Sequence, residues 1–271
     1  MKIITLTFII FLLFSIKVSA QQPDSITDIR DSIFAINLPE YKEKANSDKT
    51  KKIAGIAIPS TMVLYGLLSL NVDRIRDIDY NTKDYLVKHD AIISTKLDNV
   101  ALFLPAGAAF GMKLCKVDNK HSLVDMTLLY GLSNTLNLGV MYSTKNTTKR
   151  RRPDGSDTES FPSGHTSSAF VAAEFLHQEY GDKSIWISIG GYSCATIIGA
   201  GRVIQNRHWV SDVIAGAGIG ILSTKAAYWL YPYINDFLRE NITCFSKHTN
   251  YTLLFPSYNQ DGLSLNFSYS F

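Results

Sequence analysis

The sequence predicts an all-α fold, a membrane-embedded bundle of about six helices, followed by a small C-terminal β-hairpin. Long apolar runs alternate with short polar segments over most of the chain. Three of these runs, at 53–70, 185–200 and 209–231, approach the length that crosses a bilayer. Close to the C-terminus the pattern changes to the alternation of apolar and polar residues that is typical of strands.

The N-terminal part of the chain predicts an exported protein. Residues 1–20 resemble a signal peptide, with Lys2 as the positive region, an apolar core at 3–16 and a small-residue cleavage site at 18–20. An uncleaved membrane anchor is the alternative interpretation. The following segment, 21–52, is polar throughout and is expected to lie on the surface.

The body of the chain, 53–235, is expected to form one helical domain, because 271 residues are enough for a single sizeable core. Polar residues at 71–99 mix both signs of charge and predict an exposed turn. A soluble periplasmic bundle is the alternative to a membrane protein. Helices are expected over the apolar runs 53–70, 100–114, 121–143, 164–180, 185–200 and 209–231. The last run contains small residues that allow close helix contacts, namely Ala215, Gly216, Ala217, Gly218 and Gly220.

The tail, 236–271, predicts a hairpin. Residues 250–257 and 263–271 alternate apolar and polar side chains, and the turn-forming segment 259–262 lies between them. Two strands cannot close a barrel, so the hairpin is expected to pack on the bundle.

Composition excludes some partners and sites. A net charge of +3 gives no argument for a nucleic-acid partner. The three cysteines are odd in number and form no C-x-x-C motif, so buried thiols are expected rather than a disulfide framework or a metal site.

The first of three motifs contains two cations that could bind phosphate. Lys145 is followed after six residues by Arg152 and Pro153. Arginine suits bidentate contact with a phosphate, whereas lysine acts as a point charge. The basic residues between them, 149–151, are interpreted instead as a juxtamembrane cluster that sets topology.

The second motif, Pro162-Ser163-Gly164-His165, precedes an apolar helical run. Ser163 can cap that helix, and Gly164 allows an anion to approach its free N–H groups. His165 is then placed in the first turn beside the anion, where it could donate a proton. Taken alone, this motif also fits an ordinary helix start.

The third motif runs from Arg202 to His208 and Asp212. The spacing of four puts His208 and Asp212 on one helix face. A carboxylate that accepts from Nδ1 fixes the imidazole tautomer and leaves Nε2 as a nucleophile. A surface His/Asp pair is the alternative interpretation.

Together, in this order, the motifs resemble the type 2 phosphatidic acid phosphatase (PAP2) superfamily, whose pattern is K-x6-R-P, P-S-G-H and S-R-x5-H-x3-D. Gly201 stands where that pattern has serine. The resemblance implies a PAP2-type helical bundle over roughly 53–231 and an enzyme that needs no metal or other cofactor. It implies His208 as the nucleophile, Asp212 as its orienter and His165 as the general acid. The phosphate would be bound by Lys145, Arg152, Ser163, Gly164 and Arg202.

The expected function is therefore hydrolysis of a lipid phosphate through a phosphohistidine. Candidate substrates are phosphatidic acid, phosphatidylglycerophosphate, undecaprenyl diphosphate and lipid A phosphates. Partners would be this lipid and the cell membrane or envelope, with the site facing the periplasm. The alternatives are a soluble periplasmic acid phosphatase, a vanadate-dependent haloperoxidase and a non-catalytic membrane protein with a vestigial motif.

Overall fold

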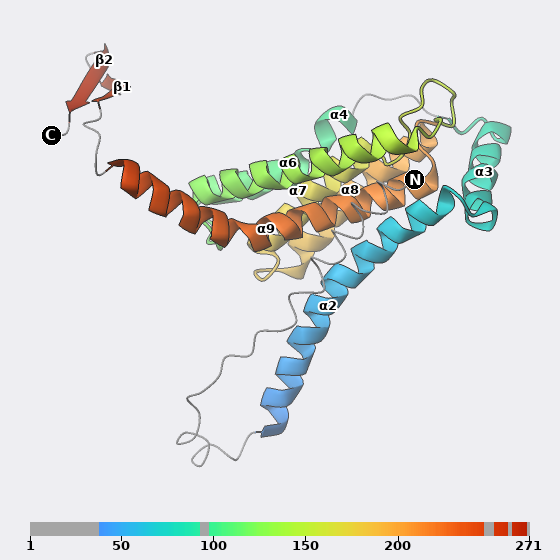
Figure 1. The fold of residues 1–271 in the computed structure, drawn as a ribbon, viewed down its shortest axis with the longest axis horizontal. Coiled ribbons are helices and arrows are strands. Elements are labelled where there is room, and N and C mark those ends of the chain that lie inside the picture. The colour runs from blue at the N-terminus through green and yellow to red at the C-terminus, as the bar shows by residue number, and fades with distance from the viewer. Residues whose placement is uncertain (1–37, 93–97, 247–251, 260–261, 270–271) are drawn as a thin grey trace. The chain divides into compact units, whose positions relative to one another are not determined.

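The computed structural model describes residues 38–92, 98–246, 252–259 and 262–269, with side chains placed at 53–92 and 100–236. The predicted signal peptide and most of the polar segment after it lie outside the described residues. The chain divides after Ala226 into two units, which are described separately. The helices in chain order (Figure 1) are α2 (Leu38–Ser69), α3 (Asp73–Lys88), α4 (Asp98–Ala101), α5 (Leu104–Leu114), α6 (Leu123–Thr148), α7 (Gly164–Tyr180), α8 (Ile185–Ile204) and α9 (Val210–Ser246), which continues into the second unit.

Helices form where the apolar runs predicted them, which confirms the helical fold. The run at 100–114 is divided into α4 and α5, and Pro105 occupies the first turn of α5, where its missing N–H costs no hydrogen bond. At the start of α6, Ser122 and Asp125 form a capping box in which each side chain accepts from the other residue's backbone.

The predicted exposed turn at 71–99 is wrong. Residues 73–88 form the helix α3, which follows α2 after a bend of 87°. The charged residues of this segment suggested solvent on all sides, but Asp79 is buried, with 1% of its surface exposed. Its partners lie far away in the sequence, so no local pattern indicated its burial.

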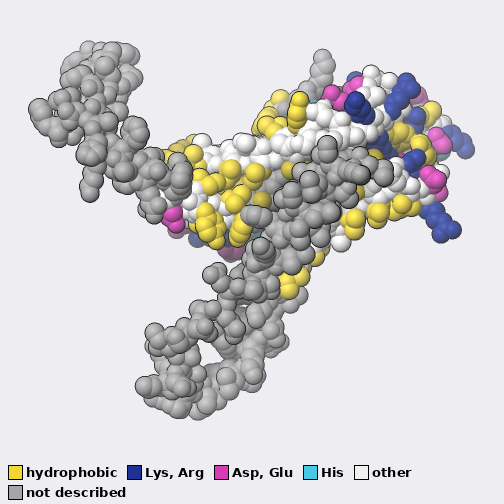
Figure 2. All heavy atoms as spheres, in the orientation of Figure 1, with side chains coloured by type: hydrophobic (Ala, Val, Ile, Leu, Met, Phe, Trp, Pro, Cys, Tyr) yellow, Lys and Arg dark blue, Asp and Glu magenta, His cyan; other side chains and the backbone are white. Residues whose placement is uncertain are grey.

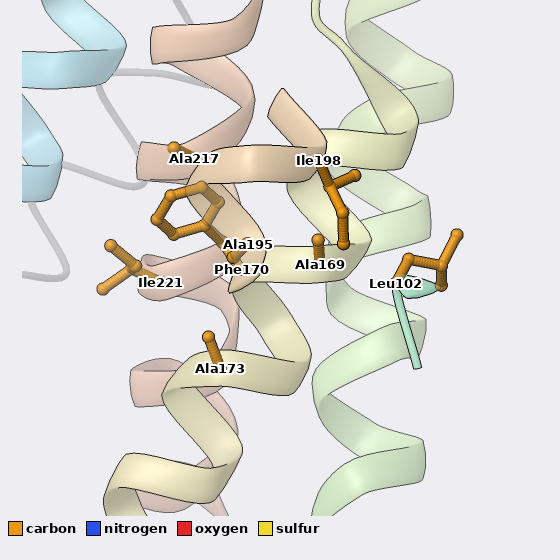
Figure 3. Close-up of a cluster of buried hydrophobic side chains, with 8 residues drawn as sticks. All are labelled: Leu102, Ala169, Phe170, Ala173, Ala195, Ile198, Ala217 and Ile221. Atoms are coloured by element: carbon orange, nitrogen blue, oxygen red, sulfur yellow. The ribbon is translucent and has the colours of Figure 1, made fainter. Parts of the chain in front are cut away.

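The core of the first unit joins α7, α8 and α9 (Figure 3). It is built around Phe170, Ile198 and Ile221 with small alanines between them, and Leu102 extends it towards α4 and α5. A second cluster of Val63, Met141 and Ile219 joins α2, α6 and α9. Large side chains packed against small ones let the helices approach closely.

Small residues on α9 make this close approach possible. A Cβ atom added to Gly216 would lie 2.6 Å from the carbonyl oxygen of Ser163, and one added to Gly218 would lie 2.5 Å from that of Pro59. Both distances are shorter than van der Waals contact, so a larger residue would push α7 or α2 away. The predicted role of the small-residue stripe in helix contact is confirmed at these positions.

Among the residues that the structure describes, two helices are long and apolar enough to cross a membrane, namely α8 and the part of α9 at Val210–Asp236. The bent pair formed by Ile53–Ser69 and α3 would be a third crossing if it counts as one broken span. Large apolar side chains also lie exposed on the outer faces, for example Ile58, Trp186 and Ile197. Such exposure suits a surface that faces lipid rather than water.

The second unit contains the end of α9 and two strands, β1 (Thr252–Asn259) and β2 (Gly262–Tyr269). The strands pair antiparallel, with Asn259 opposite Gly262 next to the turn. The packing of this hairpin on the bundle stays a prediction, as does the division of the chain into domains at 53–235 and 236–271.

The expectation for the cysteines is wrong at one position. Cys115 and Cys194 are both free thiols, but Cys115 is exposed because it follows the end of α5, and Cys194 is half-buried. Within the described residues no cluster of three metal-binding side chains is found.

Candidate active site

The loop between α6 and α7 brings the first motif to the start of the second. Backbone bonds close it, since Arg152 donates to Asp157 at 3.0 Å and Ser160 donates to Arg150 at 2.9 Å. The side chains of Asp154 and Asp157 each accept from the backbone two residues ahead, which stabilises the turns. Figure 2 shows Lys and Arg side chains gathered at this end of the first unit, where α3 and the loop lie.

Two predicted phosphate-binding cations come from this segment. Lys145, in the last turn of α6, donates from Nζ to the carbonyl oxygen of Glu159 at 2.5 Å. Arg152 is held by Asp157, whose Oδ1 lies 2.8 Å from Nε. Burial lowers the pKa of Lys145 below its ordinary 10.5, and the charge of Arg152 lowers it further against the opposing effect of nearby carboxylates. The two cations therefore share one electrostatic environment.

The second motif forms the start of α7, with Gly164 as its first residue and His165 as its second. Ser163 precedes the helix at the capping position, but its hydroxyl pairs with the Thr166 hydroxyl at 2.8 Å instead of capping the backbone. The predicted side-chain cap is therefore wrong. The Ser163 N–H donates to the carbonyl oxygen of Asp212 at 3.1 Å, which ties α7 to the third motif.

The third motif contains a buried histidine, His208, that feels the charges of Arg152 and Arg202. His208 is 3% exposed, and its backbone N–H donates to the carbonyl oxygen of Arg202 at 3.3 Å. Burial lowers the pKa of His208 below 6.5, and the charges of Arg152 and Arg202 act in the same direction while Asp212 opposes them. The imidazole is therefore neutral at neutral pH, as a nucleophile requires.

The partner of His208 Nδ1 differs from the prediction. Nδ1 lies 2.8 Å from the carbonyl oxygen of Ser160 but 3.8 Å from Oδ2 of Asp212. Nδ1–H therefore donates to the backbone, which fixes the same tautomer and leaves Nε2 with its lone pair. The predicted direct hydrogen bond from Nδ1 to Asp212 is wrong, although the carboxylate is near enough to act on the imidazole charge.

Asp212 instead organises the surroundings of the histidine. Its Oδ2 accepts from the backbone N–H of Trp209 at 3.0 Å and from the hydroxyl of Ser160. Its Oδ1 accepts from Nη1 of Arg150 at 2.7 Å. Because Ser160 supplies the carbonyl that orients His208, Asp212 acts on the imidazole through Ser160.

Arg150 is a site residue that the sequence interpretation missed. The side chain is 12% exposed and reaches two fully buried carboxylates, Asp79 through Nη2 at 2.7 Å and Asp212 through Nη1 at 2.7 Å. The interpretation as a topology-setting cation is therefore wrong for Arg150. Only its position two residues before Arg152 could have indicated a structural role, since alternate residues of an extended loop face the same side.

Asp79 is the second missed residue, and it caps α9. It accepts from the backbone N–H of Ser211 at 2.9 Å and from the Ser211 hydroxyl at 2.5 Å. With Asp212 accepting from Trp209, two carboxylates satisfy free N–H groups at the start of α9 and complement its dipole.

Trp209 packs beside the histidine and is 9% exposed. Its Nε1 donates to the carbonyl oxygen of Arg151 at 2.9 Å. Tyr80 meets the indole edge-on with ring centroids 5.3 Å apart, and Arg150 and Lys83 lie over it at 5.5 and 5.6 Å. Trp209 thus packs against α3.

The three motifs lie in a region that is similar to a known protein family. Residues 126–236 match the sequence model of the PAP2 superfamily, and this range contains all three motifs. The part of the chain that carries the three motifs is thus similar to the PAP2 superfamily.

Two curated relatives are similar to the chain over part of their length. Lipid A 1-phosphatase of Porphyromonas gingivalis is 36% identical over 171 residues, which cover 62% of this chain and 37% of the relative. Bacitracin transport permease protein BcrC of Bacillus licheniformis is 31% identical over 88 residues, or 32% of this chain and 41% of the relative. The chain thus spans less than half of the length of both relatives.

Two solved structures are also similar. One is a transmembrane PAP2 type phosphatidylglycerolphosphate phosphatase from Bacillus subtilis, with 22% identity, a TM-score of 0.44 and coverage of 65% of this chain and 97% of that one. The other is Aquifex aeolicus LpxE, with 24% identity, a TM-score of 0.38 and coverage of 49% and 83%.

The departure from the PAP2 motif at Gly201 leaves open space. A Cβ added there would meet only Nε2 of Gln205, at 3.9 Å. Gln205 itself accepts from Nη1 of Arg202 at 2.9 Å through Oε1. In this chain the neighbour of the motif arginine is thus an amide from the end of α8 rather than a serine hydroxyl.

Proposed function

We propose that this protein is a membrane-bound phosphatase that removes phosphate from a lipid through a phosphohistidine. The observation that carries the proposal is the environment of His208, a buried neutral imidazole with Nδ1–H bonded to Ser160 and two PAP2-motif arginines nearby. Nε2 is left to attack, and the arginines would stabilise the charge on the phosphoryl oxygens.

In the first step His208 Nε2 attacks the phosphorus. The N–P bond forms as the bond from phosphorus to the leaving oxygen breaks, and His165 donates a proton to that oxygen. Lys145, Arg152 and Arg202, together with the N–H groups at the start of α7, would hold the equatorial oxygens.

In the second step water attacks the phosphohistidine. His165, now neutral, takes a proton from this water, the N–P bond breaks, and inorganic phosphate leaves with His208 restored. The charge that develops on His208 while the phosphate is attached is offset by Asp212, whose Oδ2 lies 3.8 Å from Nδ1.

A lipid substrate is supported by the apolar exteriors of α2 and α8 and by the two helices of membrane-spanning length. The first relative's name, a lipid A 1-phosphatase, favours a phosphate on a lipid-linked sugar. Phosphatidic acid, phosphatidylglycerophosphate and undecaprenyl diphosphate are the competing substrates.

We place the site on the periplasmic side of the cell membrane. A cleaved signal would start the mature chain outside, and crossings by 53–70 and 121–143 would return the Lys145 loop to that side. This needs 100–114 not to cross, and α5 supports it, because its 11 residues span only about 16 Å. Labelling of an Asp154→Cys variant in intact cells tests this orientation, since a cytoplasmic site would leave the thiol unlabelled.

The decisive experiment compares wild type and His208→Ala over a panel of lipid phosphates in detergent. We expect phosphate release from at least one lipid, and a loss of about 10⁴-fold or more in kcat for the variant. Acid quench during turnover should trap phosphate on His208. A variant with unchanged thermal unfolding and wild-type turnover would exclude the mechanism.

A further inference from the structure

A large cavity lies beside the proposed nucleophile, and apart from Arg152 its lining residues have no part in the steps above. Its volume is about 830 Å³, within the range of small-molecule sites. A separate small space of about 10 Å³ adjoins this cavity, since Lys83, Pro153 and Trp209 line both and His208 lines the smaller one.

The cavity is strongly basic. Among its lining residues is one carboxylate, Asp154, which is paired with Arg207 at 3.1 Å, so its charge is already offset. Hydrogen bonds to Ser156 lower the pKa of Asp154 although burial opposes them, and the carboxylate stays ionised. The cations of the lining are Arg76, Lys83, Arg150, Arg151 and Arg152.

Three of these cations already have partners. Arg150 bridges the two buried aspartates, and Arg152 is paired with Asp157. Arg76 donates to the carbonyl oxygens at the end of α2, including that of Ser69 at 3.2 Å, and lies 3.6 Å from Asp73. The charges of these three arginines are therefore largely offset by partners within the fold.

Lys83 and Arg151 differ from the other three. In the part of the chain that the structure describes, neither forms an ion pair with a carboxylate. Lys83 lies over the Trp209 ring at 5.6 Å, and the Arg151 guanidinium lies against Gly155, with Nη2 3.3 Å from the place of a Cβ on that glycine. Two cations without a carboxylate partner among the described residues thus line the same cavity as the aromatic rings of Tyr80 and Trp209.

We propose that this cavity is a second anion subsite, in which Lys83 and Arg151 bind a further anionic group on the substrate's headgroup. Resting on the proposed function, the inference selects lipids whose sugar or polyol headgroup carries a second phosphate. Tyr80, which is 47% exposed, offers a ring face on which a sugar packs, and the two cations would supply charge-assisted hydrogen bonds to the second phosphate. The reacting phosphate would lie at His208, which lines the small space next to this cavity.

The test compares two lipids in neutral detergent micelles, one with a single headgroup phosphate and one with a second phosphate on the headgroup sugar. We expect wild type to show a KM about tenfold lower for the bisphosphorylated lipid, the size of one charged hydrogen bond. The double variant Lys83→Gln/Arg151→Gln should remove this preference and leave kcat and the KM of the monophosphorylated lipid unchanged. Lys149→Gln is the matched control, because Lys149 is exposed and does not line the cavity.

A preference that survives in the double variant, or that Lys149→Gln removes equally, would overturn the subsite. An effect seen only after anionic phospholipid is added to the micelles would also overturn it, since the cations would then bind the membrane surface. Each single variant is measured as well, so poor folding of the double variant does not decide the result.

Binding separates the subsite from the proposed function. Equilibrium binding of both lipids is measured on His208→Ala, with and without the two glutamine substitutions. Tighter binding of the bisphosphorylated lipid that depends on Lys83 and Arg151, without turnover by wild type, would retain the subsite and reject the phosphatase. Turnover without that binding preference would do the reverse.

Discussion

Two of the buried carboxylate groups in the bundle are neutralised in different ways. Next to His208, Asp79 and Asp212 share the single guanidinium of Arg150. Within the bundle, Glu174 on α7 has a lysine of its own, Lys225 on α9 at 2.8 Å.

The other hydrogen-bond partners of Glu174 and Asp212 differ as well. Glu174 accepts from the side chains of Tyr192 and Gln178, so its contacts join α7 to α8 and α9 and end there. The contacts of Asp212 continue through Ser160 to Nδ1 of His208. A buried ion pair thus holds helices together in one region and positions the proposed nucleophile in the other, and only the second should affect chemistry.

The largest effect is expected for the substitution Arg150→Gln, which tests whether the two regions differ. It leaves two buried carboxylates without their cation, so we expect a loss of about 3–5 kcal/mol in the free energy of unfolding. Displacement of Ser160 and His208 should also lower kcat by about 10²-fold in the folded fraction. Denaturant unfolding and steady-state kinetics measure the two effects.

The exposed neighbour Lys149→Gln is the control for Arg150→Gln and should change neither quantity. If Arg150→Gln lowered stability while kcat of the folded enzyme stayed at the wild-type value, Arg150 would be structural only.

Glu174→Gln is the matching change in the other region. The lysine partner is 24% exposed at its side chain and can be hydrated, so we expect a smaller loss of about 2 kcal/mol in unfolding free energy. Because the contacts of Glu174 do not reach the catalytic histidine, kcat and KM should stay within about twofold of wild type. A fall in kcat as large as that of Arg150→Gln would remove the distinction between the two regions.

Lys145→Arg tests the charge of the phosphate site. Since burial lowers the pKa of Lys145 below 10.5, the ammonium is lost as pH rises through that lowered value, and KM should rise there. Arginine stays protonated over this range, so the rise should move to higher pH in the variant. KM measured between pH 7 and 10.5 checks this, and an unchanged alkaline limb would assign it to another group.

The last prediction concerns the acid limb of the pH profile of kcat/KM in wild type, where the smallest change is expected. Burial lowers the pKa of His208 below 6.5, so Nε2 stays unprotonated until the pH falls below that value. We expect kcat/KM to fall on the acid side only below pH 6.5 and to keep the same limb in Glu174→Gln. An acid limb above 6.5 in wild type would contradict a buried neutral histidine.

The linear chain was enough to nominate the candidate reacting groups of this protein. Motif spacing identified Lys145, Arg152, Arg202 and both histidines as candidates, because catalysis fixes residue types at short separations along the chain. The apolar runs 164–180 and 185–200 predicted α7 and α8 nearly to their ends, since a long apolar run is a local feature of the sequence.

Only the tertiary structure decided how those groups are held. Asp79 and Arg150 are 71 residues apart and meet only when α3 packs against the start of α9. The partner of His208 Nδ1 is a backbone carbonyl, and every residue has one, so no sequence pattern could indicate Ser160. Burial turned Arg150 from one of several similar basic residues into the bridge between two carboxylates, because a charge leaves water only where opposite charges from distant segments meet it.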